Sequence, residues 1–216
     1  MVDFTSQVAK KFRDGWKHST KVLPTIKRIF YVAYSGSGLI HLAKFCDYRF
    51  VLVFLRIFKS CFQQNFLSNI VGNTQLQFHG TRRACRIAES PSDVTSCNRA
   101  DCNFCRILKG SYNMERAKGA RMFGPGIYCT LVSSKADDYT SNTNDNLRSR
   151  VMIVNHVVLG RTKIMYEASH DMQHAPHLYN SVCPSPIQLY TELTFPSIRS
   201  LQPLILKEAK LITTKL

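Results

Sequence analysis

The chain has 216 residues, of which 44% are hydrophobic, enough for one domain with a substantial core. A formal net charge of +15, from 29 Lys and Arg against 14 Asp and Glu, favours acidic partners such as nucleic acid or phosphate-rich small molecules. No apolar run approaches the ~20 residues of a membrane span, and no secretory signal is visible, so we expect an intracellular protein of the nucleus or cytoplasm with reduced cysteines.

Residues 1–72 form a basic N-terminal segment, with 11 Lys and Arg against three Asp. Within it, residues 9–21 are typical of a polar amphipathic helix, and residues 26–33 are β-branched and aromatic, as in a strand. Residues 39–68 are apolar, contain no proline or glycine, and are expected to be helical. We predict that this segment packs on a domain formed by residues 73–216.

A polar insert covers residues 82–118. It holds four cysteines at the spacing C-x11-C-x4-C-x2-C, namely Cys85, Cys97, Cys102 and Cys105. A C-x2-C knuckle with two nearby thiols suits a structural tetrahedral Zn²⁺, whereas four unpaired core cysteines would need a more apolar segment. The insert is therefore predicted to bind zinc.

A tight turn followed by two tyrosines marks the centre of the chain. Residues 124–126 are Gly-Pro-Gly, and the apolar run around Tyr128 that follows predicts a short strand. Ser133 and Ser134 stand where a helix N-cap is expected, ahead of Tyr139. Two aromatic faces beside a glycine-lined wall suit the stacking of a flat ring. The alternative is an ordinary strand–helix connection with two core tyrosines.

Most remaining segments after residue 72 have strand character. The expected strands are 76–81, 151–159, 163–166, 187–195 and one that begins at 203–206. Polar loops are expected between them. Many strands and few helices predict an α+β fold built on antiparallel sheets.

Two of these strands carry residues suited to chemistry. His79 precedes Gly80 at a strand end, where the glycine leaves its backbone open to a ligand. Glu192 is the one acid in an otherwise uncharged strand, and such a carboxylate needs a partner or a task.

Together these segments resemble the catalytic domain of the poly(ADP-ribose) polymerase family, the diphtheria-toxin-like ADP-ribosyltransferases. The matching motifs are FHGT at 78–81, MFGPGIY at 122–128, SKADDY at 134–139 and YTE at 190–192. The resemblance runs from about residue 73 to 207, and the Cys-rich insert is similar to that of small fungal members. It implies split antiparallel sheets around a crevice for NAD⁺, with few helices.

The resemblance also implies the roles of individual residues in NAD⁺ binding. His79 would hold the adenosine ribose, and Gly80, with Thr81 in the same motif, would bind the nicotinamide carboxamide end. Tyr139 would stack on the nicotinamide, and Tyr128 would line the opposite side.

For catalysis the resemblance implies the set His79, Tyr128 and Glu192. Glu192 would bond the 2′-hydroxyl of the nicotinamide ribose and stabilise an oxocarbenium-like transition state. One position departs from the family pattern, because Ala136 stands where a serine usually bonds the carboxamide. Either Ser133 or Ser134 takes over that contact from a neighbouring position, or NAD⁺ binds more weakly.

These residues predict transfer of ADP-ribose from NAD⁺, a consumed substrate, to a protein or nucleic-acid acceptor. One alternative is a zinc-braced basic module that binds nucleic acid or an ADP-ribose-like ligand without turnover. An RNA 2′-phosphotransferase shares the fold, but its site relies on arginines, and Glu192 argues against it.

Overall fold

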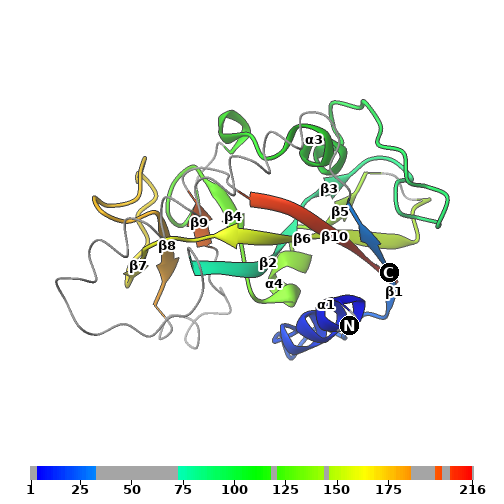
Figure 1. Cartoon of the computed structure of the whole chain (residues 1–216), viewed down its shortest axis with the longest axis horizontal. Helices are drawn as coiled ribbons and strands as arrows, with labels where there is room; N and C mark the ends of the chain where they lie inside the picture. The colour runs from blue at the N-terminus through cyan, green and yellow to red at the C-terminus, as the bar shows by residue number, and fades with distance from the viewer. Residues whose placement is uncertain are drawn as a thin grey trace.

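The computed structural model gives the architecture shown in Figure 1. It describes residues 4–32, 73–117, 121–143, 146–185, 198–200 and 205–215. The predicted helix over 39–68, the predicted strand over 187–195 and Glu192 within that strand lie outside the described residues. No helix in the described part of the chain has the length and apolar character required to cross a membrane.

A four-stranded antiparallel sheet forms the centre of the molecule. Its order is β1 (Ile26–Tyr31), β10 (Ile205–Lys215), β6 (Ser149–Val158) and β2 (Thr74–Gly80). The strand predictions at these four places are confirmed, with bounds shifted by a few residues. Because β10 lies between β1 and β6, the N-terminal segment is joined to the main domain through the sheet itself.

A second four-stranded sheet has the order β4 (Ile127–Cys129), β9 (Ile198–Ser200), β8 (Ser181–Pro184) and β7 (Thr162–Met165). Strands β7 and β8 pair in parallel, so the expectation of purely antiparallel sheets is wrong at this edge. The expectation of a loop through 167–186 is also wrong at β8. Pairing with β7 and β9 makes this short segment a strand.

A parallel pair of two-residue strands, β3 (Arg82–Arg83) and β5 (Ser141–Asn142), ties the start of the insert to the segment after the second tyrosine. The helices in the described ranges are short: α1 (Phe4–Asp14), α3 (Asn103–Gly110), the 3₁₀ turn η2 (Met114–Arg116) and α4 (Ser133–Asp137). The α+β prediction is confirmed.

Two helix predictions need correction. Helix α1 begins and ends earlier than the predicted 9–21, and Gly15 donates its N–H to the Lys11 carbonyl at the helix end. The N-cap of α4 is Val132, and Ser133 is already the first helical residue.

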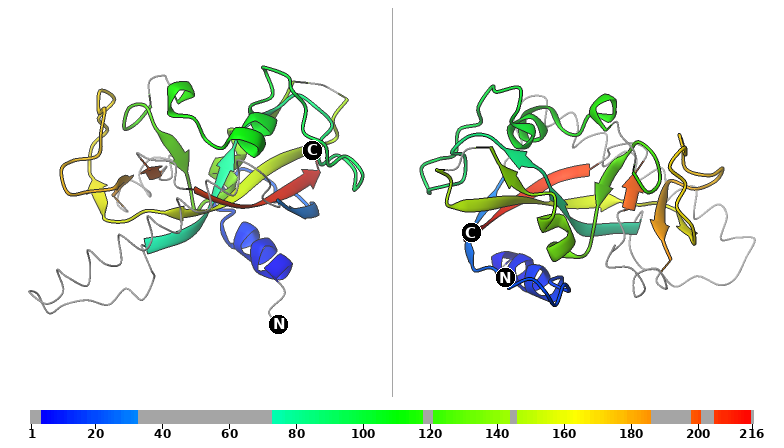
Figure 2. Two further views of the ribbon diagram at one scale, coloured as in Figure 1. Left: turned by 45° about the horizontal axis from the view of Figure 1, so that its top comes forward. Right: turned by 180° about the vertical axis from the view of Figure 1, so that it is seen from behind.

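The central sheet has apolar cores on both faces. Along β6, Met152 and Val154 join the cluster with Phe12 of α1, while Val151 and Ile153 join the cluster of the insert and α3. This alternation follows from the two-residue period of a strand. Accordingly α1 and α3 lie on opposite sides of the sheet in each view (Figure 2).

Candidate functional site

The candidate site is a cavity of ≈ 530 Å³ whose walls come from both four-stranded sheets and the insert. The sheets are joined where Phe78 and Thr130 exchange two backbone hydrogen bonds of 2.7 and 3.0 Å. Both residues line the cavity beside this bridge. The volume is in the range of small-molecule sites.

The cavity brings together five of the residues singled out from the sequence. They are His79, Gly80, Thr81, Tyr128 and Tyr139. They come from three separate segments, which end β2, form β4 and follow α4. Their convergence in one cavity is what a shared ligand requires.

His79 is held as a neutral imidazole. Its Nδ1 lies 2.9 Å from the Tyr128 carbonyl oxygen, which can only accept, so Nδ1 carries the proton. Burial lowers the pKa of His79 to about 4, and the nearby Arg121 charge acts in the same direction. The Tyr112 ring packs edge-on at 4.9 Å. Because Nδ1 carries the proton of the neutral ring, Nε2 is an acceptor, suited to a ribose hydroxyl.

Gly80 is required by close contact with α4. A Cβ at this position would lie 1.8 Å from the Ala136 carbonyl oxygen and 3.0 Å from Tyr139 Cβ. Only a residue without a side chain lets the end of β2 approach α4 so closely. The Ala136 side chain is itself buried, at 2% exposure.

The two tyrosines occupy different situations. The Tyr128 hydroxyl donates to the Gly124 carbonyl at 2.7 Å and accepts the Phe123 N–H at 3.1 Å, which fixes the ring to the Gly-Pro-Gly turn. Tyr139 is 47% exposed and lines the cavity, so its ring is accessible to a ligand. The ammonium of Lys135 lies 5.7 Å from the centroid of that ring.

Ser133 and Ser134 do not line the cavity. Both are fully buried, and their hydroxyls bond the N-terminal segment: Ser133 Oγ donates to the Phe12 carbonyl at 2.6 Å, and Ser134 Oγ lies 2.8 Å from His18 Nδ1. In this geometry they do not replace the serine missing at Ala136, because the docking of distant residues directs them away from the cavity.

The cavity also contains basic residues that the motifs did not indicate. Four arginines line it, namely Arg82, Arg106, Arg116 and Arg121, and no Asp or Glu stands among the described lining residues. The sequence signals for them were the overall net charge and the basic residues scattered through the insert, which do not by themselves show which side chains converge. A wall of this kind suits the diphosphate of a dinucleotide.

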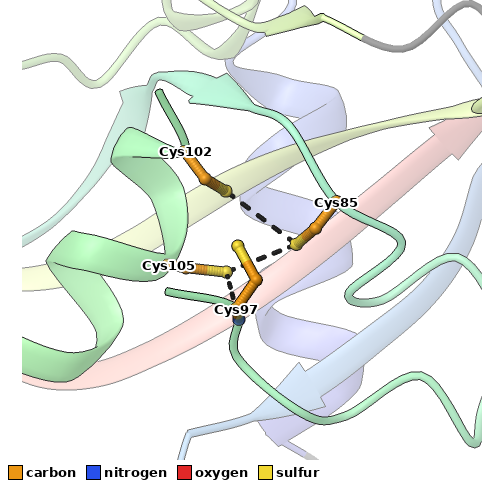
Figure 3. A group of neighbouring side chains, drawn as sticks. All are labelled: Cys85, Cys97, Cys102 and Cys105. Carbon is orange, nitrogen blue, oxygen red and sulfur yellow. Dashed lines mark hydrogen bonds between the residues drawn. The ribbon is translucent and has the colours of Figure 1, made fainter. Parts of the chain in front are cut away.

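The four predicted metal ligands converge in the insert (Figure 3). The thiols of Cys85, Cys97, Cys102 and Cys105 all lie within 4.8 Å of one another. The Sγ–Sγ distances are 3.4 Å for Cys85–Cys105 and 3.9 Å for Cys85–Cys102. Tetrahedral Zn²⁺ with Zn–S bonds of ~2.3 Å would set its sulfurs about 3.8 Å apart. The donor set therefore fits such an ion and could hold a metal.

Backbone groups around the cluster favour thiolates. The Ala84 N–H donates to Cys102 Sγ at 3.3 Å, and the Cys97 N–H donates to Cys105 Sγ at 3.4 Å. Hydrogen bonding from Cys105, aided by the Ala84 N–H, lowers the pKa of Cys102. The same Cys102–Cys105 hydrogen bond raises the pKa of Cys105, and burial raises the pKa of Cys85, so Cys102 is the thiolate of the cluster without metal. By contrast, burial raises the pKa of Cys129, in the cavity wall, to about 12, which makes it unsuited to act as a nucleophile.

Residues 100–185 match the family model of the poly(ADP-ribose) polymerase catalytic domain. The matched segment is less than half of the chain. It includes Tyr128 and Tyr139 but not His79 or Glu192. A comparison with curated proteins finds no match. The match confirms the resemblance to this family over a segment that contains two of the four motifs, and the described α+β architecture agrees with the ADP-ribosyltransferase fold that the match implies.

Proposed function

We propose that this chain is an ADP-ribosyltransferase that transfers ADP-ribose from NAD⁺ to an acceptor and releases nicotinamide. The observation that carries the proposal is the single cavity lined by His79, Gly80, Thr81, Tyr128 and Tyr139. The family match supports NAD⁺ as the substrate. The arginine-rich wall supports a ligand with a diphosphate.

In the proposed reaction, the bond between nicotinamide N1 and ribose C1′ breaks. Nicotinamide leaves with the bonding electrons as a neutral molecule, and the ribose acquires oxocarbenium character. An acceptor oxygen or nitrogen then bonds C1′ and loses a proton. No oxidant or reductant takes part.

Three residues of the cavity have a proposed role in NAD⁺ binding, and a fourth residue, Glu192, has one in catalysis. Neutral His79 accepts a hydrogen bond from the adenosine ribose through Nε2, and Tyr139 stacks on the nicotinamide. Gly80 binds the carboxamide through its backbone. Glu192, by the resemblance alone, holds the 2′-hydroxyl of the nicotinamide ribose and stabilises the developing positive charge.

Nicotinamide release from NAD⁺ by the purified chain tests the proposal. Wild-type protein should release nicotinamide, and Glu192→Gln should lower turnover on the order of 10²–10³-fold while NAD⁺ affinity changes much less. Tyr139→Phe should bind NAD⁺ almost normally, whereas Tyr139→Ala should lose roughly 1–3 kcal/mol of stacking. Unchanged turnover in a folded Glu192→Gln variant would remove Glu192 from the mechanism.

One observation favours a second function, a module that binds NAD⁺ or ADP-ribose without turnover. Ala136 offers the carboxamide no hydroxyl, and Ser133 and Ser134 bond the N-terminal segment instead. Such a module would bind NAD⁺ in calorimetry and release no nicotinamide. The same two measurements therefore separate the two functions.

The net charge of +15 supports an acidic acceptor, either nucleic acid or an acidic protein surface. Incubation with labelled NAD⁺ and each class in turn would identify it by the fraction that becomes labelled. The described cysteines are free thiols, which fits an intracellular location.

The cysteine cluster is proposed to hold one structural Zn²⁺ through Cys85, Cys97, Cys102 and Cys105. Four protein ligands leave no open position for catalysis. The ion would join the chain after β3 to helix α3, whose Arg106 and Ile107 line the cavity.

Elemental analysis should find one zinc per chain, and a strong chelator should loosen the insert and weaken NAD⁺ binding. Cys183→Ser, outside the cluster, is the control and should retain the metal. A folded protein that purifies without metal and keeps its NAD⁺ affinity would contradict the zinc proposal.

A further inference from the structure

Helix α4 is contacted at Ser133 and Ser134 by residues 12–21, which comprise the end of α1 and the loop that follows it. We refer to residues 12–21 as the N-terminal clamp. Among the described residues that line the cavity, none comes from the clamp. It therefore contacts the helix beside the candidate site without contacting a ligand in the cavity.

Two buried serines of α4 are bonded to the clamp. Ser133 Oγ donates to the Phe12 carbonyl at 2.6 Å. Ser134 Oγ accepts the N–H groups of Lys17 and His18 at 3.0 and 3.3 Å, and it lies 2.8 Å from His18 Nδ1. All these bonds join parts of the chain that are far apart in sequence.

Lys21 makes the ionic contacts of the clamp. Its ammonium donates to the Ser134 carbonyl at 3.0 Å, and it pairs with Asp138 and, at 3.5 Å, with Asp137. Asp137 is only 5% exposed and is shared with Arg150 of β6 at 3.1 Å. One lysine thus contacts the first turn of α4 at Ser134, its last residue Asp137 and its C-cap Asp138.

Close packing fixes the clamp itself. A Cβ on Gly15 would lie 2.7 Å from the Leu131 carbonyl oxygen, so the clamp and the start of the α4 segment touch through their backbones. Trp16 Nε1 donates to the Lys21 carbonyl at 3.0 Å, and its ring packs on Phe12 with centroids 5.5 Å apart. The indole therefore fixes the position of the Lys21 backbone, from which the side chain extends to α4.

Helix α4 depends on such support. It has five residues, its N-cap Val132 provides no side-chain hydrogen bond, and a helix of that length is unstable alone. At its end the Ala136 carbonyl packs against Gly80, and Tyr139 follows at the cavity wall. Any movement of α4 would displace both.

We infer that the N-terminal clamp sets the affinity of the nicotinamide end of the cavity by positioning α4, and that Lys21 is its principal positioning residue. This inference rests on the proposed function, in which Gly80 and Tyr139 bind nicotinamide. It makes NAD⁺ binding dependent on residues that never touch NAD⁺.

Three variants test the role of Lys21. Lys21→Met removes the charge and keeps the length, and Lys21→Arg restores the charge. Lys10→Met is the matched control, because Lys10 pairs with Asp14 on the exposed face of α1 at 2.6 Å and does not touch α4. Ser134→Ala is a second, milder lesion that serves if Lys21→Met fails to fold.

Kinetics and competition give the first readout. Lys21→Met should raise the KM for NAD⁺ and the inhibition constant of nicotinamide about fivefold to tenfold, with kcat within about twofold of wild type. The inhibition constant of ADP, which lacks nicotinamide, should not change. Lys21→Arg should recover most of the loss, and Lys10→Met should match wild type.

Trp16, the only tryptophan of the chain, gives a readout that needs no turnover. If clamp and cavity are coupled, nicotinamide binding should change the packing of the clamp, because coupling is reciprocal, and Trp16 emission reports that packing. Lys21→Met should shift that emission towards longer wavelengths and raise the nicotinamide concentration needed for the response.

The outcomes are distinct. An unchanged KM for NAD⁺ and unchanged nicotinamide inhibition constant in Lys21→Met would overturn the inference, as would equally weakened binding of nicotinamide and ADP. In either case, nicotinamide release by the wild-type protein would still uphold the proposed function. A wild-type protein that releases no nicotinamide but shows the Trp16 response, weakened by Lys21→Met, would overturn only the proposed turnover. Absence of both release and response would overturn both.

Discussion

The two walls of the cavity are held by different chemistry. The wall formed by α4 is fixed by interlocking backbones and buried hydrogen bonds from the N-terminal clamp, on a core that includes Phe12 and Phe78. The wall formed by α3 belongs to a polar insert that depends on a thiol cluster and one buried arginine. The first wall is thus sensitive to added volume, and the second to the loss of single polar groups.

Replacement of Arg83 should destabilise the insert wall most. It is fully buried, and its guanidinium bonds Glu89 Oε2 at 3.0 Å, the Ile87 carbonyl at 2.8 Å and the Ser149 carbonyl. Arg83→Met would leave Glu89 without its buried partner, so unfolding free energy in denaturant titrations should fall by about 3–5 kcal/mol.

The matched control lies in the same insert. Arg99 pairs with Asp101 at 2.9 Å on the surface, and Arg99→Met should leave the unfolding midpoint unchanged. An equal loss of unfolding free energy in both variants would mean that the contribution of Arg83 to stability does not depend on its burial.

Two glycines, one on each wall, sharpen the comparison. Gly80→Ala forces a Cβ towards the Ala136 carbonyl, and such overpacking should destabilise the fold or NAD⁺ binding by about 1–3 kcal/mol. At Gly110, which ends α3, a Cβ meets nothing within 4 Å. Gly110→Ala should therefore be neutral or stabilise by up to about 1 kcal/mol. Calorimetric NAD⁺ titrations and melting curves of both variants decide the matter.

Acid should affect the cavity through His79. The unfolded chain holds its imidazole near pKa 6.5 and the folded chain near about 4, so between these values the unfolded state binds more protons. The free energy of unfolding should therefore rise with pH across this window, by at most about 1.4 kcal/mol per pH unit. His79→Gln should flatten that part of the profile, whereas His174→Gln, in an exposed loop, should not.

A stabilising effect is expected at Ser111, which follows α3 and lines the cavity. Its backbone has φ 66° and ψ −174°, a region that essentially only glycine adopts. Ser111→Gly should raise the free energy of unfolding by about 1 kcal/mol or more. Ser111→Ala keeps the strain and should show no such gain in the same denaturant titration.

The sequence predicted local structure best where one pattern dominated. The buried run of β6 and the Gly-Pro-Gly turn before β4 need only neighbouring residues to define them. The motifs also indicated the cavity residues His79, Gly80, Thr81, Tyr128 and Tyr139, because each lies within a recognisable segment.

Long-range contacts account for what the sequence did not reveal. The family resemblance suggested a ligand contact for Ser133 or Ser134, but residues more than a hundred positions earlier engage both hydroxyls. Helix α3 was not predicted, because it is short and lies in a segment that was interpreted through its cysteines alone. Its buried face forms where Phe104 and Cys105 pack in the cluster that contains Val151 and Ile153 of β6.

The strand order β1-β10-β6-β2 has a consequence for synthesis of the chain. Strand β1 pairs with β10, which the ribosome produces long after it, so β1 and the adjoining edge of β6 must remain open until then. Closing such distant pairs is slow, and the open edges offer sites for wrong pairing meanwhile. Nascent chains that stop before residue 205 should therefore bind chaperones, and pulse-labelling would show them released only when β10 has emerged.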